Sequence, residues 1–227
     1  MMDRNTTPQD TAHDDSHASR ALDRNVLART AAHLYERYAH VVDRETVERV
    51  LQESYEELER TAAVKTYLTA SAGNFADSRL RSLAIARGAI EARNPRVLFV
   101  DDANAGRSQM AASLVLQHTE GRITARSAGL EPAGAIYDAA VEAMAEVGVN
   151  LEHAYPKPLA DDIHRAAQLV VTLACADRVE RVDGVEYRDW DIPSLEGSDI
   201  EDARRVRDDI DTRVRELIAE LGHGAES

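Results

Sequence analysis

The segment Asp101-Asp102-Ala103-Asn104-Ala105-Gly106-Arg107-Ser108 combines the residue types that bind a tetrahedral anion. Small residues let its backbone N–H groups converge, and a helix starting near Ser108 directs the positive end of its dipole inward. The guanidinium of Arg107 can bind two oxygens at once, and Asn104 tolerates the left-handed backbone of a tight loop. The sequence therefore predicts an oxyanion-binding loop made of Asp102, Ala103, Asn104, Ala105, Gly106, Arg107 and Ser108.

A buried strand must precede this loop and a helix must follow it. Residues 96–100, Arg-Val-Leu-Phe-Val, are typical of a strand buried on both faces. Helix and strand patterns then alternate: helix 108–117, strand 123–127, helix 137–147, short helix 160–165, strand 168–173 and helix 200–221. The alternation predicts an α/β domain with a doubly wound parallel sheet, in which ligands bind beyond the carboxyl ends of the strands.

The residues before this domain have a helical pattern. Apolar side chains recur at three- and four-residue steps from Ala21 to about Gly88, with Asp43 expected to cap the second of three helices. The predicted organisation is a mobile tail (1–20), a three-helix bundle (21–88), a linker (89–95), the α/β domain (96–222) and a short tail (223–227). Because three such helices enclose only a small core, we expect the bundle to be a dimerisation module; the alternative is a structural appendage.

Charge and composition exclude several partners. The formal net charge is −14, and residues 96–227 hold 14 Lys and Arg against 26 Asp and Glu, a balance that repels nucleic acid and anionic membranes. No run approaches the roughly 20 apolar residues of a membrane span, and the polar start does not resemble a signal peptide, so we expect a cytoplasmic protein. The single cysteine, Cys175, excludes an intramolecular disulfide and a cysteine-rich zinc site. We expect no cofactor and no metal site.

Residues 97–112 resemble the low-molecular-weight tyrosine phosphatase and arsenate reductase family, whose loop pattern is Cys-x2-Asn-x2-Arg-Ser. Further matches follow in order along residues 96–221: Ser127-Ala-Gly129, Pro156-Lys-Pro-Leu159, Val170-Val-Thr-Leu173, Tyr187-Arg-Asp-Trp-Asp191 and the final helix. Together they look more like the actinobacterial arsenate reductases than the eukaryotic phosphatases. In some members of that branch an N-terminal three-helix bundle resembles a dimerisation domain.

Both catalytic positions that the resemblance implies differ here. The family begins its loop with a low-pKa cysteine thiolate that attacks phosphorus or arsenic, and this sequence has Asp101 there. The general acid, an Asp-Pro pair in the family, falls on Ser194-Leu195 by its spacing from Trp190. Arsenate reduction in the family also passes oxidation to further thiols, whereas Cys175 has no partner in the chain.

The sequence leaves two uses of Asp101 open. Its carboxylate is an oxygen nucleophile, which together with Asp102 would recruit Mg²⁺, or it occupies the loop itself and accepts the backbone N–H bonds that an oxygen of a bound phosphate would take. Two unit charges about 4 Å apart repel by roughly 4 kcal/mol at an effective dielectric of 20, which favours the second use. We therefore expect a non-catalytic regulatory or oxyanion-binding homologue that binds phosphate, arsenate or a similar anion and pairs as a homodimer or heterodimer through residues 21–88. The alternatives are an enzyme using Asp101 or a metal, and a purely structural scaffold.

Overall fold

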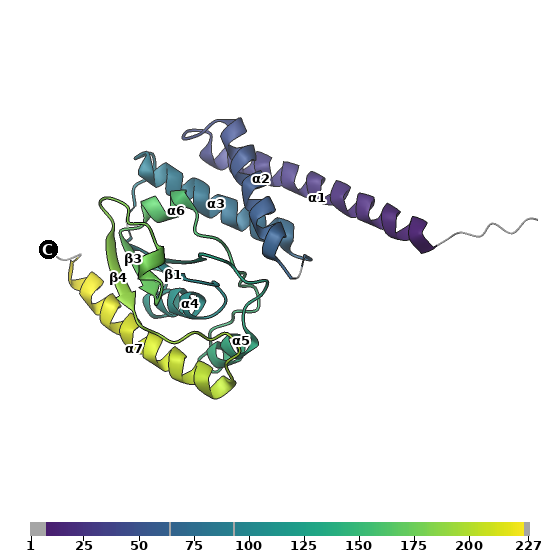
Figure 1. Cartoon of the computed structure of the whole chain (residues 1–227). Coiled ribbons are helices and arrows are strands. Elements are labelled where there is room, and N and C mark those ends of the chain that lie inside the picture. The colour runs from purple at the N-terminus through teal and green to yellow at the C-terminus, as the bar shows by residue number, and fades with distance from the viewer. Residues whose placement is uncertain (1–7, 64, 93, 225–227) are drawn as a thin grey trace, which may run out of the picture.

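The computed structural model describes residues 8–63, 65–92 and 94–224 and forms three layers around one parallel sheet (Figure 1). The helices are α1 Pro8–Tyr38, α2 Arg44–Thr61, α3 Leu68–Ala86, α4 Arg107–Thr119, α5 Asp138–Ala145, α6 Asp161–Ala166, the 3-10 turn η1 Ala176–Arg178 and α7 Ile200–Gly224. The strands are β1 Arg96–Asp101, β2 Thr124–Gly129, β3 Leu169–Leu173 and β4 Glu186–Trp190. This order confirms the predicted α/β fold with N-terminal helices.

The sheet has the strand order β2-β1-β3-β4, and every neighbouring pair is parallel. Strands β1 and β3 lie at the centre and are buried on both faces, as their continuous apolar sequences predict. Strand β4 was not predicted, because Glu186-Tyr-Arg-Asp-Trp190 lies at the edge, exposes most of its polar side chains and lacks an apolar run. Because β1 and β2 are parallel neighbours, their carboxyl ends at Asp101 and Gly129 lie side by side at one edge of the sheet.

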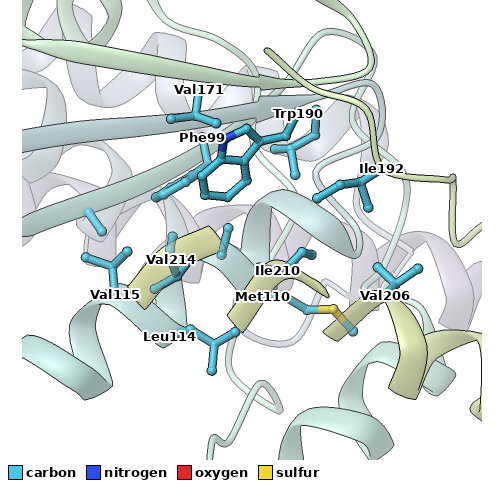
Figure 2. Close-up of a cluster of buried hydrophobic side chains, with 14 of the residues drawn as sticks. Phe99, Met110, Leu114, Val115, Val171, Trp190, Ile192, Val206, Ile210 and Val214 are labelled. Atoms are coloured by element: carbon cyan, nitrogen blue, oxygen red, sulfur yellow. The ribbon is translucent and has the colours of Figure 1, made fainter. Parts of the chain in front are cut away.

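Each face of the sheet has its own hydrophobic core, because side chains alternate along a strand. Val97 and Phe99 of β1 point to the face covered by α4, α5 and α7, where Phe99 packs against Trp190 with ring centroids 5.7 Å apart (Figure 2). Leu98 and Val100 point to the opposite face and belong to the core that contains α1, α2, α3 and α6. The two cores together hold the strand that carries the loop.

The N-terminal helices cover the second face of the sheet. Helix α3 lies beside α6 (Figure 1), and its Phe75 and Leu80 share a core with Leu98 and Val170 of the sheet. Asp43 caps α2 as expected, since its carboxylate accepts the N–H of Thr46 at 2.8 Å. The apolar surface of the bundle is thus buried within the chain, and its small core alone no longer argues for a dimer.

The first helix begins earlier than the sequence indicates. Residues 8–20 were assigned to a mobile tail, but α1 starts at Pro8, while residues 1–7 lie outside the described residues. Proline suits the first position of a helix, and a helix already packed at residues 22–38 extends into a polar segment at little cost per residue. At the other end α7 continues to Gly224, into the segment expected to be a tail. No helix of the described part of the chain is long and apolar enough to cross a membrane.

Candidate functional site

Residues 101–108 form a tight loop between the end of β1 and the start of α4. Asn104 has φ 48°, which confirms the left-handed conformation expected of it. Gly129, at the end of β2, lies so close that a Cβ there would be 2.9 Å from the Cβ and backbone N of Asn104. Only a residue without a side chain fits this contact, so the two strand ends fix the shape of the loop together.

The carboxylate of Asp101 lies inside the loop. Its Oδ1 accepts the N–H of Asn104 at 2.6 Å and its Oδ2 accepts the N–H of Ser108 at 3.1 Å. The residue is only 2% exposed, and burial raises its pKa although these two N–H bonds and the Arg107 charge act in the opposite direction. The acid therefore satisfies two backbone N–H groups of its own loop.

Arg107 is buried beside this carboxylate. Its Nε lies 3.9 Å from Asp101 Oδ2, and its Nη1 donates to the carbonyl of Ile192 at 2.7 Å. The guanidinium is thus held between the loop and the segment that follows β4. The two groups form an ion pair at the long end of the range for such pairs.

Some backbone N–H groups of residues 101–108 have no hydrogen-bond partner among the described residues. The backbone N–H groups of Ala103, Ala105 and Gly106 donate no hydrogen bond to any described residue. A methyl group at Gly106 would lie 3.1 Å from Leu195 Cδ1 and 3.3 Å from Tyr137 Cδ2, so these two side chains line the loop closely. These three N–H groups therefore have no partner among the described residues, and Leu195 and Tyr137 leave little space beside Gly106.

Asp102 is separated from the cradle by its ion pair. Its carboxylate binds Arg178 Nη1 at 2.5 Å, and the same guanidinium binds Glu131 at 2.6 Å. Both side chains of the Asp102–Arg178 pair are 45% exposed, and Arg178 is shared with Glu131, so the pairing offsets the Asp102 charge only in part. Among residues 8–63, 65–92 and 94–224 no group of three or more His, Cys, Asp or Glu is placed to hold a metal ion.

Ser194, the predicted general-acid position, is exposed and interacts with its own segment. Its Oγ accepts the N–H of Glu196 at 3.2 Å, and its carbonyl accepts the hydroxyl of Ser198 at 3.4 Å. Asp189 and Asp191, on either side of Trp190, are also exposed, and Asp189 Oδ1 accepts the hydroxyl of Thr172 at 2.6 Å. A hydroxyl group is a far weaker acid than a carboxyl group, so Ser194 offers no proton donor of the usual kind.

A polar network behind the loop was not predicted from the sequence. Asn104 Oδ1 accepts hydrogen bonds from Gln109 Nε2 at 2.9 Å and from the backbone N–H of Lys157 at 3.0 Å, while its Nδ2 donates to Ser108 Oγ at 2.9 Å. Lys157 Nζ donates to Ser127 Oγ at 3.1 Å, and burial lowers the pKa of this lysine to about 8. The matched stretches Ser127–Gly129 and Pro156–Leu159 were the available signal, since both contribute to this network.

Cys175 should not react as a nucleophile in the folded protein. Its Sγ is buried and donates to the carbonyl of Val100 at 3.4 Å, and burial raises the pKa of the thiol to about 11. The thiolate is the reactive form, so we expect almost no modification by Ellman's reagent at about pH 8 until denaturant is added. Cys175→Ala provides the blank because the chain has no other cysteine. Rapid stoichiometric labelling of the native protein would contradict the buried position.

Two family comparisons account for most of the chain. Residues 27–84 match the family described as protein-tyrosine-phosphatase-like, N-terminal domain, and residues 96–226 match the low molecular weight phosphotyrosine protein phosphatase family. Because the second match covers more than half of the chain, the protein belongs to the low molecular weight phosphotyrosine protein phosphatase family. The α/β fold with N-terminal helices agrees with this assignment.

Several of the proteins that it resembles are arsenate reductases. The structure of the thioredoxin-dependent arsenate reductase of Corynebacterium glutamicum is 40% identical, with a TM-score of 0.79 over 88% of this chain and 98% of that one. A putative arsenate reductase of Halobacterium salinarum is 32% identical over 54% of this chain and 90% of its own length. The arsenate reductase of Bacillus subtilis is 33% identical over 57% of this chain and 98% of its own length. The Corynebacterium protein matches through the N-terminal helices as well.

Proposed function

We propose that this protein is a non-catalytic member of its family that responds to oxyanions through residues 101–108. The observation that carries the proposal is the position of the Asp101 carboxylate, which accepts N–H bonds from Asn104 and Ser108 inside the cradle. In this proposal Asp101 stands where the family has its attacking cysteine, and Ser194 stands where the family has its acid.

Thiol-based arsenate reduction lacks its chemical groups in this chain. A thiolate must attack arsenic and a second thiol must then resolve the oxidised sulfur, whereas the only cysteine is Cys175, buried with a pKa raised to about 11. The carboxylate alternative is disfavoured as well, because both oxygens of Asp101 accept backbone N–H bonds and Asp102 pairs with Arg178. Neither residue presents a free oxygen pair for Mg²⁺.

Weak anion binding is compatible with the same geometry. Suitable donors are the guanidinium of Arg107 and the backbone N–H groups of Ala103, Ala105 and Gly106, which have no partner among the described residues. Before an anion binds, however, the Asp101 side chain must move out of the loop or take up a proton. Since like charges about 4 Å apart repel by roughly 4 kcal/mol at an effective dielectric of 20, we expect dissociation constants for phosphate and arsenate at this loop of about 1 mM or weaker. A regulatory role, alone or with an active relative paired through residues 21–88, is part of the proposal.

Turnover assays test the catalytic half of this proposal. With p-nitrophenyl phosphate, with and without Mg²⁺, and with arsenate plus thioredoxin and its reductase, the natural chain should not exceed the buffer blank. Appreciable turnover that survives repeated purification would overturn the non-catalytic assignment.

Calorimetry tests the binding half. Titration with phosphate or arsenate should give weak binding at the loop, and this binding should be lost in Arg107→Lys, which cannot bind two oxygens side by side. Arg24→Ser, an exposed change on α1, is the matched control. If Arg107→Lys binds both anions as the natural chain does, the loop is not an anion site.

A further inference from the structure

A cavity of about 230 Å³ lies at the amino-terminal edge of the sheet, far from the loop. Its walls include the start of β1 at Arg96, the start of β2 at Thr124, and Arg81 and Ser82 of α3. β1 runs from Arg96 to Asp101, so at about 3.3 Å per residue the two sites lie roughly 16 Å apart. The cavity is therefore separate from residues 101–108.

Three arginine side chains, Arg81, Arg96 and Arg126, line this cavity, and none of them makes an ion pair with a described carboxylate. Arg126 Nη1 donates to Ser78 O at 2.7 Å and to Ser82 Oγ at 2.8 Å. Arg96 Nε donates to the carbonyl of Ala166 at 2.6 Å. These partners are neutral, so no described carboxylate forms an ion pair with these three guanidinium groups.

The nearby carboxylates are engaged elsewhere. Asp77 binds Arg37 at 3.0 Å and accepts the hydroxyl of Tyr38 at 2.9 Å, and Asp162 binds Arg79 at 2.9 Å. Burial lowers the pKa of Arg126, and the Arg81 charge lowers it further. In a chain of net charge −14, three such arginines around one cavity indicate a place for an anionic ligand.

The remaining lining defines the kind of anion. Thr124 adds a hydroxyl group, whereas the Ser82 hydroxyl already donates to the carbonyl of Ser78 at 2.9 Å. Leu98 and Ile163 supply an apolar wall, and Glu91 is the one carboxylate among the described lining residues. A cavity of about 150 Å³ suffices for benzene, so this one has room for a phosphate group and a small organic group. Guanidinium forks match phosphate oxygens in pairs.

We propose that this cavity binds the phosphate group of a small organic phosphate between Arg81, Arg96 and Arg126, with the organic part against the apolar wall. The bound ligand connects α3 to β1 and β2 and so strengthens the contact between the N-terminal helices and the sheet. The site is independent of any chemistry at the loop.

Phenylphosphonate is the probe, because it joins a dianion to an apolar ring and is not a phosphatase substrate. Calorimetry on the full chain should give a dissociation constant below about 1 mM, tighter than for inorganic phosphate, together with a rise in melting temperature. Arg81→Ser should weaken binding at least about tenfold; its side chain is exposed and makes no hydrogen bond or ion pair with a described residue, so folding should be unaffected. Arg126→Met should weaken it further.

Two controls separate this site from the loop. Arg107→Lys and Arg24→Ser should bind phenylphosphonate as the natural chain does, and amide resonances of Thr124 and Ala166 should shift on titration. The proposal is overturned if Arg81→Ser binds unchanged, if Arg107→Lys alone abolishes binding, or if no heat appears at about 20 mM probe.

Discussion

Asp101→Cys should hydrolyse p-nitrophenyl phosphate at least about 100-fold faster than the natural chain, because it supplies a sulfur nucleophile to a loop that is otherwise formed. The N–H groups of Asn104 and Ser108, which now donate to the carboxylate, would donate to the thiolate. The start of α4 and the Arg107 charge both lower the pKa of a thiol placed there. The measurement is the release of p-nitrophenolate at neutral pH, followed by its absorbance.

Substrates with different leaving groups test whether residue 194 occupies the position of a general acid. p-Nitrophenolate leaves without much help from an acid, whereas phenolate needs a proton. Asp101→Cys alone should therefore act poorly on phenyl phosphate, and Asp101→Cys with Ser194→Asp should improve that reaction by about 100-fold or more, the usual contribution of a general acid. No improvement with the second change would mean that residue 194 does not reach the leaving group.

Asp101→Ala is the matched control, since it opens the cradle without adding a nucleophile. It should bind phosphate more tightly than the natural chain and turn over nothing. If Asp101→Cys is no faster than Asp101→Ala, the loop does not support thiol chemistry, and the proposed equivalence of Asp101 to the family cysteine is wrong.

The pH dependence of stability gives an independent check on Asp101. Burial raises its pKa in the folded protein, so the folded state holds this proton more tightly than the unfolded state. The stability linked to Asp101 is therefore present at low pH and is lost as pH rises through the folded-state pKa. Urea unfolding should show Asp101→Ala becoming more stable relative to the natural chain as the pH rises.

Local signals explain what the sequence predicted well. Asp43 caps α2 and Asn104 is left-handed, and both depend on the chemistry of one side chain and its neighbours in the chain. The apolar runs at 96–100 and 168–173 likewise predict β1 and β3. A strand buried on both faces is continuously apolar, so its own sequence identifies it without knowledge of the neighbouring strands. The loop was predicted for the same reason.

Contacts between distant residues explain what was missed. Lys157 lies 53 residues from Asn104 and yet donates its backbone N–H to the Asn104 side chain, and Arg178 lies 76 residues from Asp102, with which it forms an ion pair. Helical periodicity identified the three N-terminal helices but not the sheet face that they cover. The pattern shows which side of a helix is buried, but not which element packs against that side. The ion pair of Asp102 was missed for the same reason.

Arg79→Met should destabilise the protein by about 3 kcal/mol, the lower end for removing one partner of a buried ion pair. Arg79 Nε binds Asp162 of α6 at 2.9 Å, and its Nη2 binds Glu53 of α2 at 3.0 Å, so this α3 side chain joins three helices. The side chain is 11% exposed, and Asp162 Oδ1 is already buried without a hydrogen-bond partner among the described residues. Because Glu53 remains 38% exposed, we take the lower value. The melting temperature should fall by about 10 °C.

Arg49→Met is the control, because Arg49 binds the same Glu53 at 2.8 Å but on the exposed side of α2. An exposed pair four residues apart contributes less than about 0.5 kcal/mol, so this variant should melt within about 2 °C of the natural chain. A double-mutant cycle of Arg79→Met with Asp162→Asn should give a coupling of at least about 1 kcal/mol. Equal losses from Arg79→Met and Arg49→Met would show that the three helices are held together by their apolar contacts alone, and that the N-terminal helices dock on the sheet without this ion pair.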